Sequence, residues 1–196
     1  MSYFKIWLIK KIYKNHIKLK NAFSRHYFVA STSARKVRSI QYPCSIVGGE
    51  FTSIQEGLQC GPGFRLEALA ECRGQFFVPE IIIGRNVCFG SNCHVGAINR
   101  IEIHDHVLVG SNVLITDHNH GNLTKEQLHI PANNRPLHSN GKIIIEQNAW
   151  IGDGVSIMPS VVIGRNAVVG TGSVVTSDIP ADSICAGVPA RIIRQL

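Results

Sequence analysis

The stretch IEQNAWIGDGVSIMPSVVIGRNAVVGTGSVV, residues 145–175, decides the fold, because an Ile or Val recurs at every sixth position without a break. The recurring residues are Ile145, Ile151, Ile157, Ile163, Val169 and Val175. An amphipathic helix repeats at about 3.6 residues and a half-buried strand at about 2, so neither explains this spacing. A six-residue period is typical of parallel β-helices, whose short strands stack equivalent side chains from coil to coil. The sequence therefore predicts an all-β parallel β-helix built from hexapeptide repeats.

The same ladder occurs earlier in the chain, with interruptions. It runs through Ile54, Cys60 and Leu66, then Ile83, Phe89 and Val95, and after a two-residue slip through Ile103, Val109 and Ile115. Glycine often follows the inward residue, which predicts tight corners where backbones approach closely. The stretches 68–80 and 116–142 break the period and are predicted to leave the coil as loops. Long loops on a regular scaffold are where functional residues concentrate.

Length and composition fit one solenoid with appendages. The chain has 196 residues, of which 44% are apolar, enough for one continuous core. We expect a basic, helical N-terminal segment at 1–40, a β-helix domain at 41–180 containing the loop 116–142, and a C-terminal tail at 181–196.

The net charge of +7 belongs to the N-terminal segment. Ten of the twenty Lys and Arg residues lie between Lys5 and Arg38, and the first acidic residue is Glu50. Two interpretations stay open: a basic amphipathic helix whose residues 1–20 lie on an anionic membrane, or a helix packed on one end of the solenoid. Lys10 and Lys11 interrupt the apolar run, so neither a signal peptide nor a membrane span is expected. Charge without an aromatic-basic pattern argues against nucleic-acid binding.

The six cysteines indicate a reducing compartment, and we expect a cytoplasmic protein, peripheral to the inner face of the membrane if the helix binds lipid. They include no C-x-x-C pair, and Cys60 and Cys93 fall at inward positions where cysteine acts as a small apolar residue. A structural role is the prediction for both.

The segment ITDHNHG, residues 115–121, is the predicted site of chemistry. His118 and His120 follow the last ladder strand before the long loop, beside Asp117. Imidazole exchanges a proton near neutral pH, so histidines at the root of a loop are candidate general bases.

At these residues the chain resembles the hexapeptide-repeat acyltransferases of the left-handed β-helix fold, particularly sugar and polysaccharide O-acetyltransferases. The resemblance covers about residues 46–196. The motifs that carry it are VLITDHNHG at 113–121, NAWIG at 148–152, and SVVTSDIP and AGVPARIIR within 173–194. The N-terminal segment departs from the family pattern, so no family property is transferred to it.

The resemblance implies a homotrimer with active sites between adjacent solenoids. Acetyl-CoA would lie in that groove and donate its acetyl group to a hydroxyl of a sugar or surface-polysaccharide precursor, without a metal. His118 takes the family's catalytic position and His120 is the competing base; Asp117 and Asn92 are further candidates for catalysis or acceptor binding.

Family positions near the donor fall on six residues: Trp150, Gly152, Thr171, Thr176, Arg191 and Arg194. The two arginines would meet the adenosine phosphates, which suits a guanidinium. A groove-filling aromatic is the alternative for Trp150, and a solvated tail is the alternative for both arginines. Ser177 replaces a lysine of some relatives, so one phosphate contact would be missing.

Two other classes of function stay open. Some left-handed β-helices are γ-class carbonic anhydrases, and His94, His118 and His120 are the residues that could be zinc ligands, although the spacing of His118 and His120 is narrower than in that family. The other is a non-catalytic trimeric scaffold. Acceptor choice is expected to lie in the loops 68–80 and 116–142, where Arg135 and His138 would meet a sugar or a neighbouring subunit.

Overall fold

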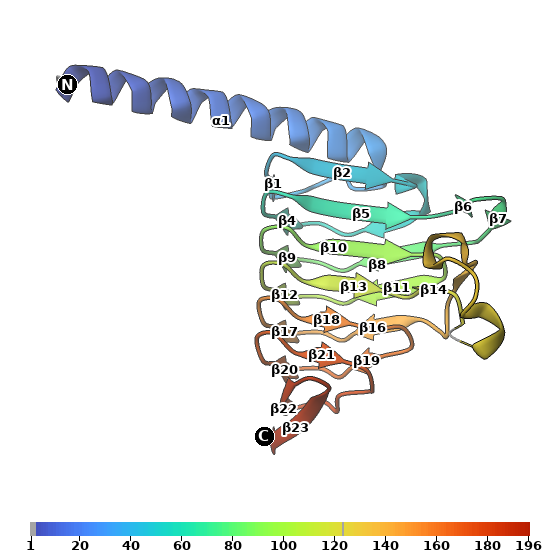
Figure 1. Ribbon diagram of the computed structural model, residues 1–196. Helices are drawn as coiled ribbons and strands as arrows, with labels where there is room; N and C mark the ends of the chain where they lie inside the picture. The colour runs from blue at the N-terminus through green and yellow to red at the C-terminus, as the bar shows by residue number, and fades with distance from the viewer. Residues whose placement is uncertain (1–2, 123) are drawn as a thin grey trace.

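Short strands stacked into three sheets make up most of the molecule, and all the strands of these sheets pair in parallel except the last two, β22 and β23 (Figure 1). The computed structural model describes residues 3–122 and 124–196. The described helices are α1 (Tyr3–Ser31) and three 3-10 turns, η1 (Gly49–Phe51), η2 (Lys125–Gln127) and η3 (Ala132–Asn134). Each turn of the chain contributes one strand to each sheet, so the strands of one sheet come from successive coils.

The eight-stranded sheet has the order β1 (Ser39–Ile40), β4 (Gln59–Cys60), β9 (Cys88–Phe89), β12 (Leu108–Val109), β17 (Trp150–Ile151), β20 (Val168–Val169), β22 (Ser183–Gly187) and β23 (Ala190–Gln195). The six-stranded sheet has the order β2 (Cys44–Val47), β5 (Phe64–Ala68), β10 (His94–Ala97), β13 (Leu114–Thr116), β18 (Ser156–Ile157) and β21 (Val174–Val175). The five-stranded sheet has the order β3 (Thr52–Ile54), β8 (Glu80–Ile83), β11 (Arg100–Ile103), β16 (Ile143–Ile145) and β19 (Val162–Ile163).

The six-residue period places one inward side chain on each of the three sheets. Ile145 therefore pairs with Ile163 on the next coil, and Ile157 pairs with Val175, eighteen residues further along in each case. All six residues of the ladder between 145 and 175 are fully buried. The parallel pairing and the buried ladder confirm the predicted repeat, and the stacked core fixes the register of every coil.

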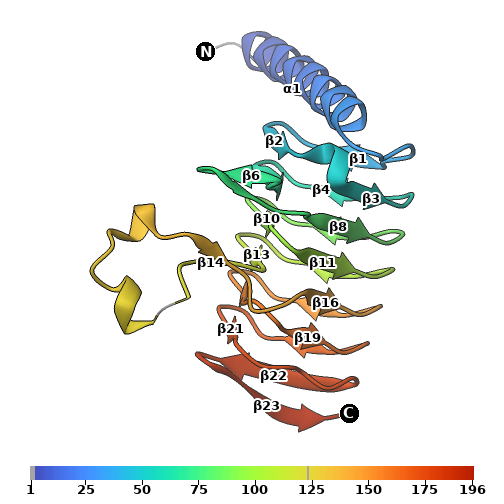
Figure 2. The ribbon, with the colours of Figure 1, turned by 90° about the vertical axis from the view of Figure 1, so that its right-hand side faces the viewer.

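The two-residue slip adds residues at one edge of the solenoid. Val95 pairs with Ile115, twenty residues away, because Ile98 and Asn99 stand between β10 and β11. The same edge, between the six-stranded and five-stranded sheets, carries both predicted loops. Residues 69–79 leave after β5 and contain the hairpin β6 (Glu71–Cys72) and β7 (Gln75–Phe76); residues 117–142 leave after β13 and contain the pair β14 (Asn119–His120) and β15 (Leu137–His138). Figure 2 shows the longer excursion standing away from the coils.

The C-terminal part of α1 covers the first coil. Phe28 is fully buried and its ring lies 6.4 Å from that of Phe64, which in turn lies 4.9 Å from Phe89. Ser24 is also buried, and its carbonyl oxygen lies 3.8 Å from Cys44 Sγ. This half of the helix packs on the solenoid, closing an end that would otherwise expose a strand edge and core side chains.

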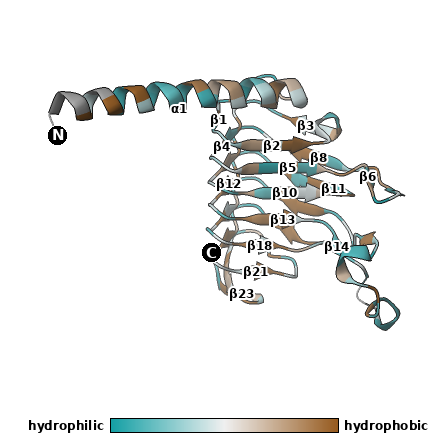
Figure 3. Ribbon diagram, turned by 45° about the horizontal axis from the view of Figure 1, so that its top comes forward, coloured by the Kyte–Doolittle hydropathy of each residue, from teal (hydrophilic) through white to brown (hydrophobic). Residues whose placement is uncertain are grey.

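The preceding part of α1 extends past the coils, and polar and apolar residues alternate along it in Figure 3. Ile9, Ile12, Leu19 and Phe23 are all exposed there. Within the described residues, no helix combines the length and the apolar character that crossing a membrane requires.

The other end of the solenoid closes with a hairpin. The segment 181–196, which we expected to be a tail, contains the whole antiparallel pair β22–β23. Antiparallel pairing lets the chain turn back on its last coil, a topology that a periodicity argument for parallel coils could not reveal. All six cysteines are free thiols, and Cys60 and Cys93 are buried as predicted. Burial raises the pKa of both thiols, which makes them poor nucleophiles.

Candidate active site

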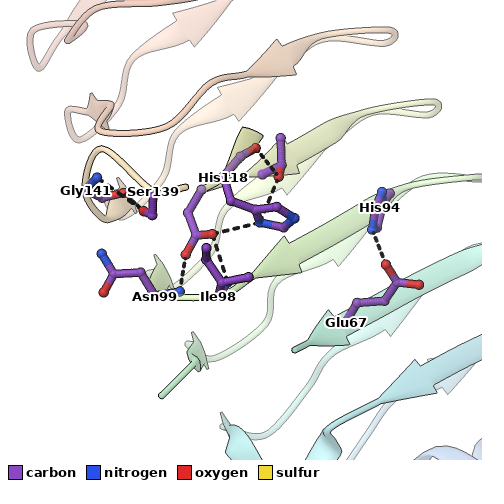
Figure 4. A network of polar contacts seen from close by, with 9 residues as sticks. Glu67, His94, Ile98, Asn99, His118, Ser139 and Gly141 are labelled. Atoms are coloured by element: carbon purple, nitrogen blue, oxygen red, sulfur yellow. Dashed lines mark hydrogen bonds and ion pairs between the residues drawn. The ribbon is translucent and has the colours of Figure 1, made fainter. Parts of the chain in front are cut away.

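Asp117 and His118 form a hydrogen-bonded pair at the root of the long loop (Figure 4). His118 Nδ1 lies 3.0 Å from Asp117 Oδ1. Since a carboxylate only accepts hydrogen bonds, Nδ1 carries the proton and donates it, which leaves Nε2 with its lone pair available. The His118 side chain is 14% exposed and that of Asp117 is fully buried. This arrangement is the one that a general base needs: a fixed tautomer, a free nitrogen and access from solvent.

The Asp117 carboxylate is held by the two residues of the slip. The Ile98 N–H donates to Oδ1 and the Asn99 N–H donates to Oδ2, each at 2.9 Å. Two backbone donors and one imidazole donor satisfy a buried charge that would otherwise be strongly unfavourable. The slip is visible in the sequence, but its role is not. Ile98 and Asn99 precede Asp117 by three coil strands, so the local sequence gives no sign that their backbone amides meet its carboxylate.

Thr116 completes the local geometry. Its hydroxyl donates to the His118 carbonyl oxygen at 3.3 Å and lies 3.3 Å from His118 Nδ1. The chain therefore turns back on itself directly after β13, and the imidazole is placed beside the strand rather than in the loop. The positions of Asp117 and His118 depend on the rigid coil, which limits their motion relative to the rest of the site.

A second pair of ionisable groups lies on the neighbouring coils. His94 on β10 has Nε2 at 3.0 Å from Glu67 Oε2, and the same oxygen accepts a hydrogen bond from Arg65 Nη2 at 2.9 Å. The two side chains are 26% and 21% exposed. Figure 4 shows this pair on the side of His118 away from Asn99. From the sequence, His94 is a candidate only as a zinc ligand, and Glu67 is not a candidate because no local pattern relates it to His94.

The two loops dock on each other beyond the dyad. Leu137 N–H donates to Gln75 Oε1 at 2.8 Å, and Arg73 Nη2 donates to Asn133 Oδ1 at 2.5 Å. They enclose a small pocket of about 140 Å³, lined by Cys72, Arg73, Gln75, His120, Asn134, Arg135, Pro136 and Leu137. His120 is exposed on β14 and has no carboxylate partner in the described part of the chain. The two candidate bases thus lie in different surroundings.

The loop cations predicted to meet an acceptor have local partners. Arg135 donates to the carbonyl oxygens of Ile130 and Leu128, and His138 Nε2 lies 3.0 Å from Asn140 Oδ1. Both residues therefore organise the loop. Their role toward an acceptor stays a prediction.

Thr176 is the donor-site candidate that shares a surface column with Thr116, the residue directly before the dyad. Continuing the register of β13, β18 and β21, Thr116, Met158 and Thr176 follow one another on successive coils. An elongated ligand on this face would pass from Thr176 toward His118.

The other candidates near the donor occupy a different edge, between the eight-stranded and six-stranded sheets. Trp150 is half-exposed on β17, and Gly152 and Thr171 form stacked corners. A Cβ atom at Gly152 would lie 2.7 Å from Thr171 N on the next coil, so close packing of the coils is enough to explain the glycine. Asn92 belongs to this edge as well: its φ of 57° is left-handed, and its amide donates to Asn112 Oδ1 at 3.2 Å. Within one chain Asn92 precedes β10 and His118 follows the far end of the neighbouring parallel strand β13, so the length of a strand separates them.

Arg191 and Arg194 lie on β23, both exposed. They are part of a paired strand, with Arg191 opposite Ala186 and Arg194 opposite Ile184, and both side chains face solvent, so their role toward the adenosine phosphates stays a prediction.

The candidate zinc ligands do not converge. His118 Nδ1 faces Asp117, His94 Nε2 faces Glu67, and His120 lies in the loop. Over residues 3–122 and 124–196, no three His, Cys, Asp or Glu side chains are grouped as a metal site requires.

Comparisons with known proteins agree with this architecture. Residues 142–177 match the family model of the bacterial transferase hexapeptide (six repeats), and residues 80–117 match that of the hexapeptide repeat of succinyl-transferase. The chain is 35% identical over 165 residues to a protein of Escherichia coli (strain K12) named "Putative lipopolysaccharide biosynthesis O-acetyl transferase WbbJ", covering 82% of this chain and 80% of that protein.

Two further similarities concern sugar and acetyl-CoA chemistry. The galactoside O-acetyltransferase of Escherichia coli (strain K12) is 40% identical over 119 residues, covering 55% of this chain and 56% of that protein. The crystal structure of a hexapeptide-repeat acetyltransferase of Vibrio cholerae O1 biovar eltor, complexed with acetyl coenzyme A, has a TM-score of 0.54 and 28% identity, covering 74% of this chain and 68% of the other. The repeats, the matched models and the similarity over 82% of the chain together show that the chain belongs to the hexapeptide-repeat acetyltransferase family.

Proposed function

We propose that this protein transfers an acetyl group from acetyl-CoA to a hydroxyl of a sugar or surface-polysaccharide precursor, with His118 as the general base. The observation that carries the proposal is the Asp117–His118 pair, with the carboxylate held by two backbone amides and Nε2 left free. His120 is less suited because no carboxylate fixes its tautomer in the described residues.

The proposed reaction needs one proton carrier. His118 Nε2 takes the proton of the acceptor hydroxyl as its oxygen attacks the thioester carbonyl carbon, and the imidazolium is stabilised by Asp117. When the tetrahedral intermediate collapses, the carbon–sulfur bond breaks and His118 returns the proton to the departing thiolate. The products are an acetyl ester and CoA thiol. We expect backbone N–H groups of a neighbouring subunit to stabilise the oxyanion.

The proposal includes a left-handed β-helix that assembles as a homotrimer. In one chain the candidate residues form two groups: His118 and Thr176 on the outward column, and Trp150, Gly152, Thr171 and Asn92 at the other edge. Packing adjacent solenoids would bring one group of each subunit to a shared groove, with Arg191 and Arg194 near its end for the adenosine phosphates. Light scattering tests this assembly: a trimer mass supports a shared site, and a monomer mass at micromolar concentration contradicts it.

The substrate test measures thiol release from acetyl-CoA against a panel of methyl glycosides and nucleotide sugars, with mass spectrometry of the product. We expect acceptor-dependent release of CoA together with an acetylated sugar. If no sugar of the panel causes release of CoA, or if acetyl-CoA is only hydrolysed, sugar acetylation is contradicted.

We also propose that residues 1–20 contact an anionic membrane surface. The support is the exposed apolar side chains of Ile9, Ile12 and Leu19 in a segment without acidic residues. The full chain should sediment with vesicles containing phosphatidylserine and be released by high salt, because salt screens surface attraction. Equal sedimentation of a chain lacking residues 1–20 would contradict this part of the proposal.

A further inference from the structure

Five cations lie together where α1 joins the first coils, at the edge between the five-stranded and eight-stranded sheets. Arg25 lies on α1, Arg35, Lys36 and Arg38 lie on the link from α1 to β1, and Arg85 lies at the corner between β8 and β9. We call these residues the Arg35 cluster. The proposed catalytic pair lies at another edge, between the six-stranded and five-stranded sheets, so catalysis does not account for the cluster.

The link from α1 to β1 is attached to the coils. Ala34 and Val37 face the core and are buried, whereas Arg35, Lys36 and Arg38 beside them are exposed. The Lys36 carbonyl oxygen accepts and the Arg38 N–H donates a hydrogen bond to the next coil, at 2.8 and 2.9 Å. The backbone therefore holds the three outward cations at fixed positions.

Two adjoining hollows open at the cluster. One has a volume of about 520 Å³ and is lined by Arg35, Lys36 and Arg85. The other has a volume of about 390 Å³ and is lined by Arg25, Arg35, Lys36 and Arg38. The Lys36 and Arg85 side chains are 79% and 62% exposed, so an anion can reach the cluster from solvent.

The cluster has too few acidic partners. Glu56 Oε2 lies 3.7 Å from Lys36 Nζ, and Asp105 Oδ2 lies 4.0 Å from Arg85 Nε. In the part of the chain that the structure describes, the side chains of the three other cations make no hydrogen bond or ion pair. Three positive charges are thus uncompensated, and a bound anion would relieve their mutual repulsion.

The larger hollow also offers a neutral donor. Ser33 Oγ accepts a hydrogen bond from the Ile54 N–H at 3.1 Å, so its own proton is free to be donated. Guanidinium, ammonium and hydroxyl groups are all donors, and phosphate oxygens are the acceptors that suit them. A phosphomonoester carries about −1.5 to −2 charges at pH 7, which matches the cluster better than a singly charged group does.

A row of cations on α1 leads to the cluster. At about 3.6 residues per turn, Lys11, Lys14, Lys18 and Arg25 fall on one side of the helix. The three lysines line one hollow along α1, and Arg25 belongs to the Arg35 cluster. The positive surface is therefore continuous from the extended part of the helix to the first coils.

The opposite faces of α1 indicate the source of the phosphate. Ser24 and Phe28 mark the face that is buried on the coils, whereas Ile12, Leu19 and Phe23 lie on the face turned away and are exposed. The row of cations lies between these two faces. A soluble anion has no use for the apolar face, but a lipid surface offers acyl chains to it and headgroup phosphates to the cations beside it.

We propose that the Arg35 cluster binds the phosphomonoester headgroup of a membrane lipid, while the exposed apolar face of α1 enters the same lipid surface. Phosphatidic acid is the simplest lipid of this class. The inference rests on the proposed membrane contact of residues 1–20 and adds a headgroup site outside that segment. It does not depend on the proposed acetyl transfer at His118.

The test is sedimentation of the full-length protein with phosphatidylcholine vesicles that contain either phosphatidic acid or phosphatidylserine, adjusted to equal zeta potential. We expect binding to phosphatidic acid to be about 10-fold tighter, because guanidinium groups form paired hydrogen bonds with a phosphomonoester. The variant with Arg35→Lys and Arg38→Lys keeps the charge and loses both guanidinium groups. Its preference should fall below about threefold, while its affinity for phosphatidylserine vesicles stays within about twofold of the parent's.

Two further variants serve as controls. Arg165→Lys alters an arginine at the same edge near the other end of the solenoid, where Nη2 lies 3.1 Å from Asp182 Oδ2, and it should keep the full preference. The variant with Leu19→Ser and Phe23→Ser should weaken binding to both kinds of vesicle by similar factors, because it removes only apolar contact. Thermal unfolding of each variant monitors folding.

The outcomes separate the proposals. Equal binding of the parent to both kinds of vesicle, or an unchanged preference in the double-lysine variant, would contradict a headgroup site and leave the membrane contact standing. If the parent sediments with neither kind, the membrane contact fails together with this inference. Soluble glycerol 3-phosphate that binds as tightly as phosphatidic acid vesicles in calorimetry would contradict the lipid source. Acceptor-dependent release of CoA without vesicles tests acetyl transfer separately.

Discussion

Two regions of the molecule share the six-residue repeat but differ in every other respect. One is the set of regular coils between residues 145 and 175. The other is the edge that carries residues 68–80, 98–99 and 116–142. In the first region each inward residue is fully buried and each step is six residues long. In the second, three successive coils are interrupted at one edge by a hairpin, a two-residue insertion and a long loop. The regular coils supply core burial, whereas the interrupted edge supplies the Asp117–His118 dyad and the two amides that hold it.

The interruptions also support one another. The two inserted residues hold Asp117, and the hairpin hydrogen-bonds to the long loop at Leu137. A functional group at such an edge inherits its position from the stacked coils and its surroundings from the loops. The comparison therefore predicts that substitutions at the edge change activity with little effect on stability, and that substitutions in the regular coils do the reverse.

The largest expected effect is that of Asp117→Asn on turnover. An amide can donate to Nδ1 and so favour the wrong imidazole tautomer, and we expect kcat to fall about 10²- to 10⁴-fold. Steady-state thiol release measures this, with thermal unfolding as the control for folding. An active Asp117→Asn enzyme would show that the amide clamp has a structural purpose only.

The second largest expected effect is on stability, and it concerns the regular coils. Ile157 is fully buried in the regular coils, so Ile157→Ala should lower the free energy of unfolding by about 2–5 kcal/mol. Leu128 is 61% exposed in the long loop, and Leu128→Ala should change the free energy of unfolding by less than about 0.5 kcal/mol. Thermal or denaturant unfolding of the two variants checks this. Equal losses of stability would mean that the loop is part of the cooperative core.

The six-residue ladder was sufficient to predict the coils, because stacking in a solenoid is a nearest-neighbour property that sequence period reports directly. It also placed both loops. The antiparallel pairs β14–β15 and β22–β23 could not be predicted from the ladder, because neither follows its six-residue period. The same limit applies to the site: His118 and Asp117 are sequence neighbours in a motif, whereas Ile98 and Asn99 meet Asp117 only because the coils stack.

The smallest predicted effect is the pH dependence of the stability that Glu67, near the end of β5, contributes. Glu67 has a lowered pKa in the folded protein, because Arg65 and His94 outweigh the opposing effect of burial. A carboxyl group of this kind stabilises the fold above its unfolded pKa of about 4.3, and the contribution is lost as pH falls through the lower, folded value. Glu67→Gln should therefore be less stable than the parent at pH 7, and the gap should close in acid. A gap independent of pH would exclude ionised Glu67 as its cause.

The most direct test of the central claim compares His118→Ala with His120→Ala in acceptor-dependent acetyl transfer. The two imidazoles lie two residues apart, but only His118 is anchored by the buried Asp117 in the structure described here. We predict that His118→Ala lowers kcat about 10²- to 10⁴-fold while its affinity for CoA and its mass in solution stay near those of the parent, and that His120→Ala has a much smaller effect. The reverse order would move the base to His120, and full activity in both variants would contradict histidine base catalysis by this protein.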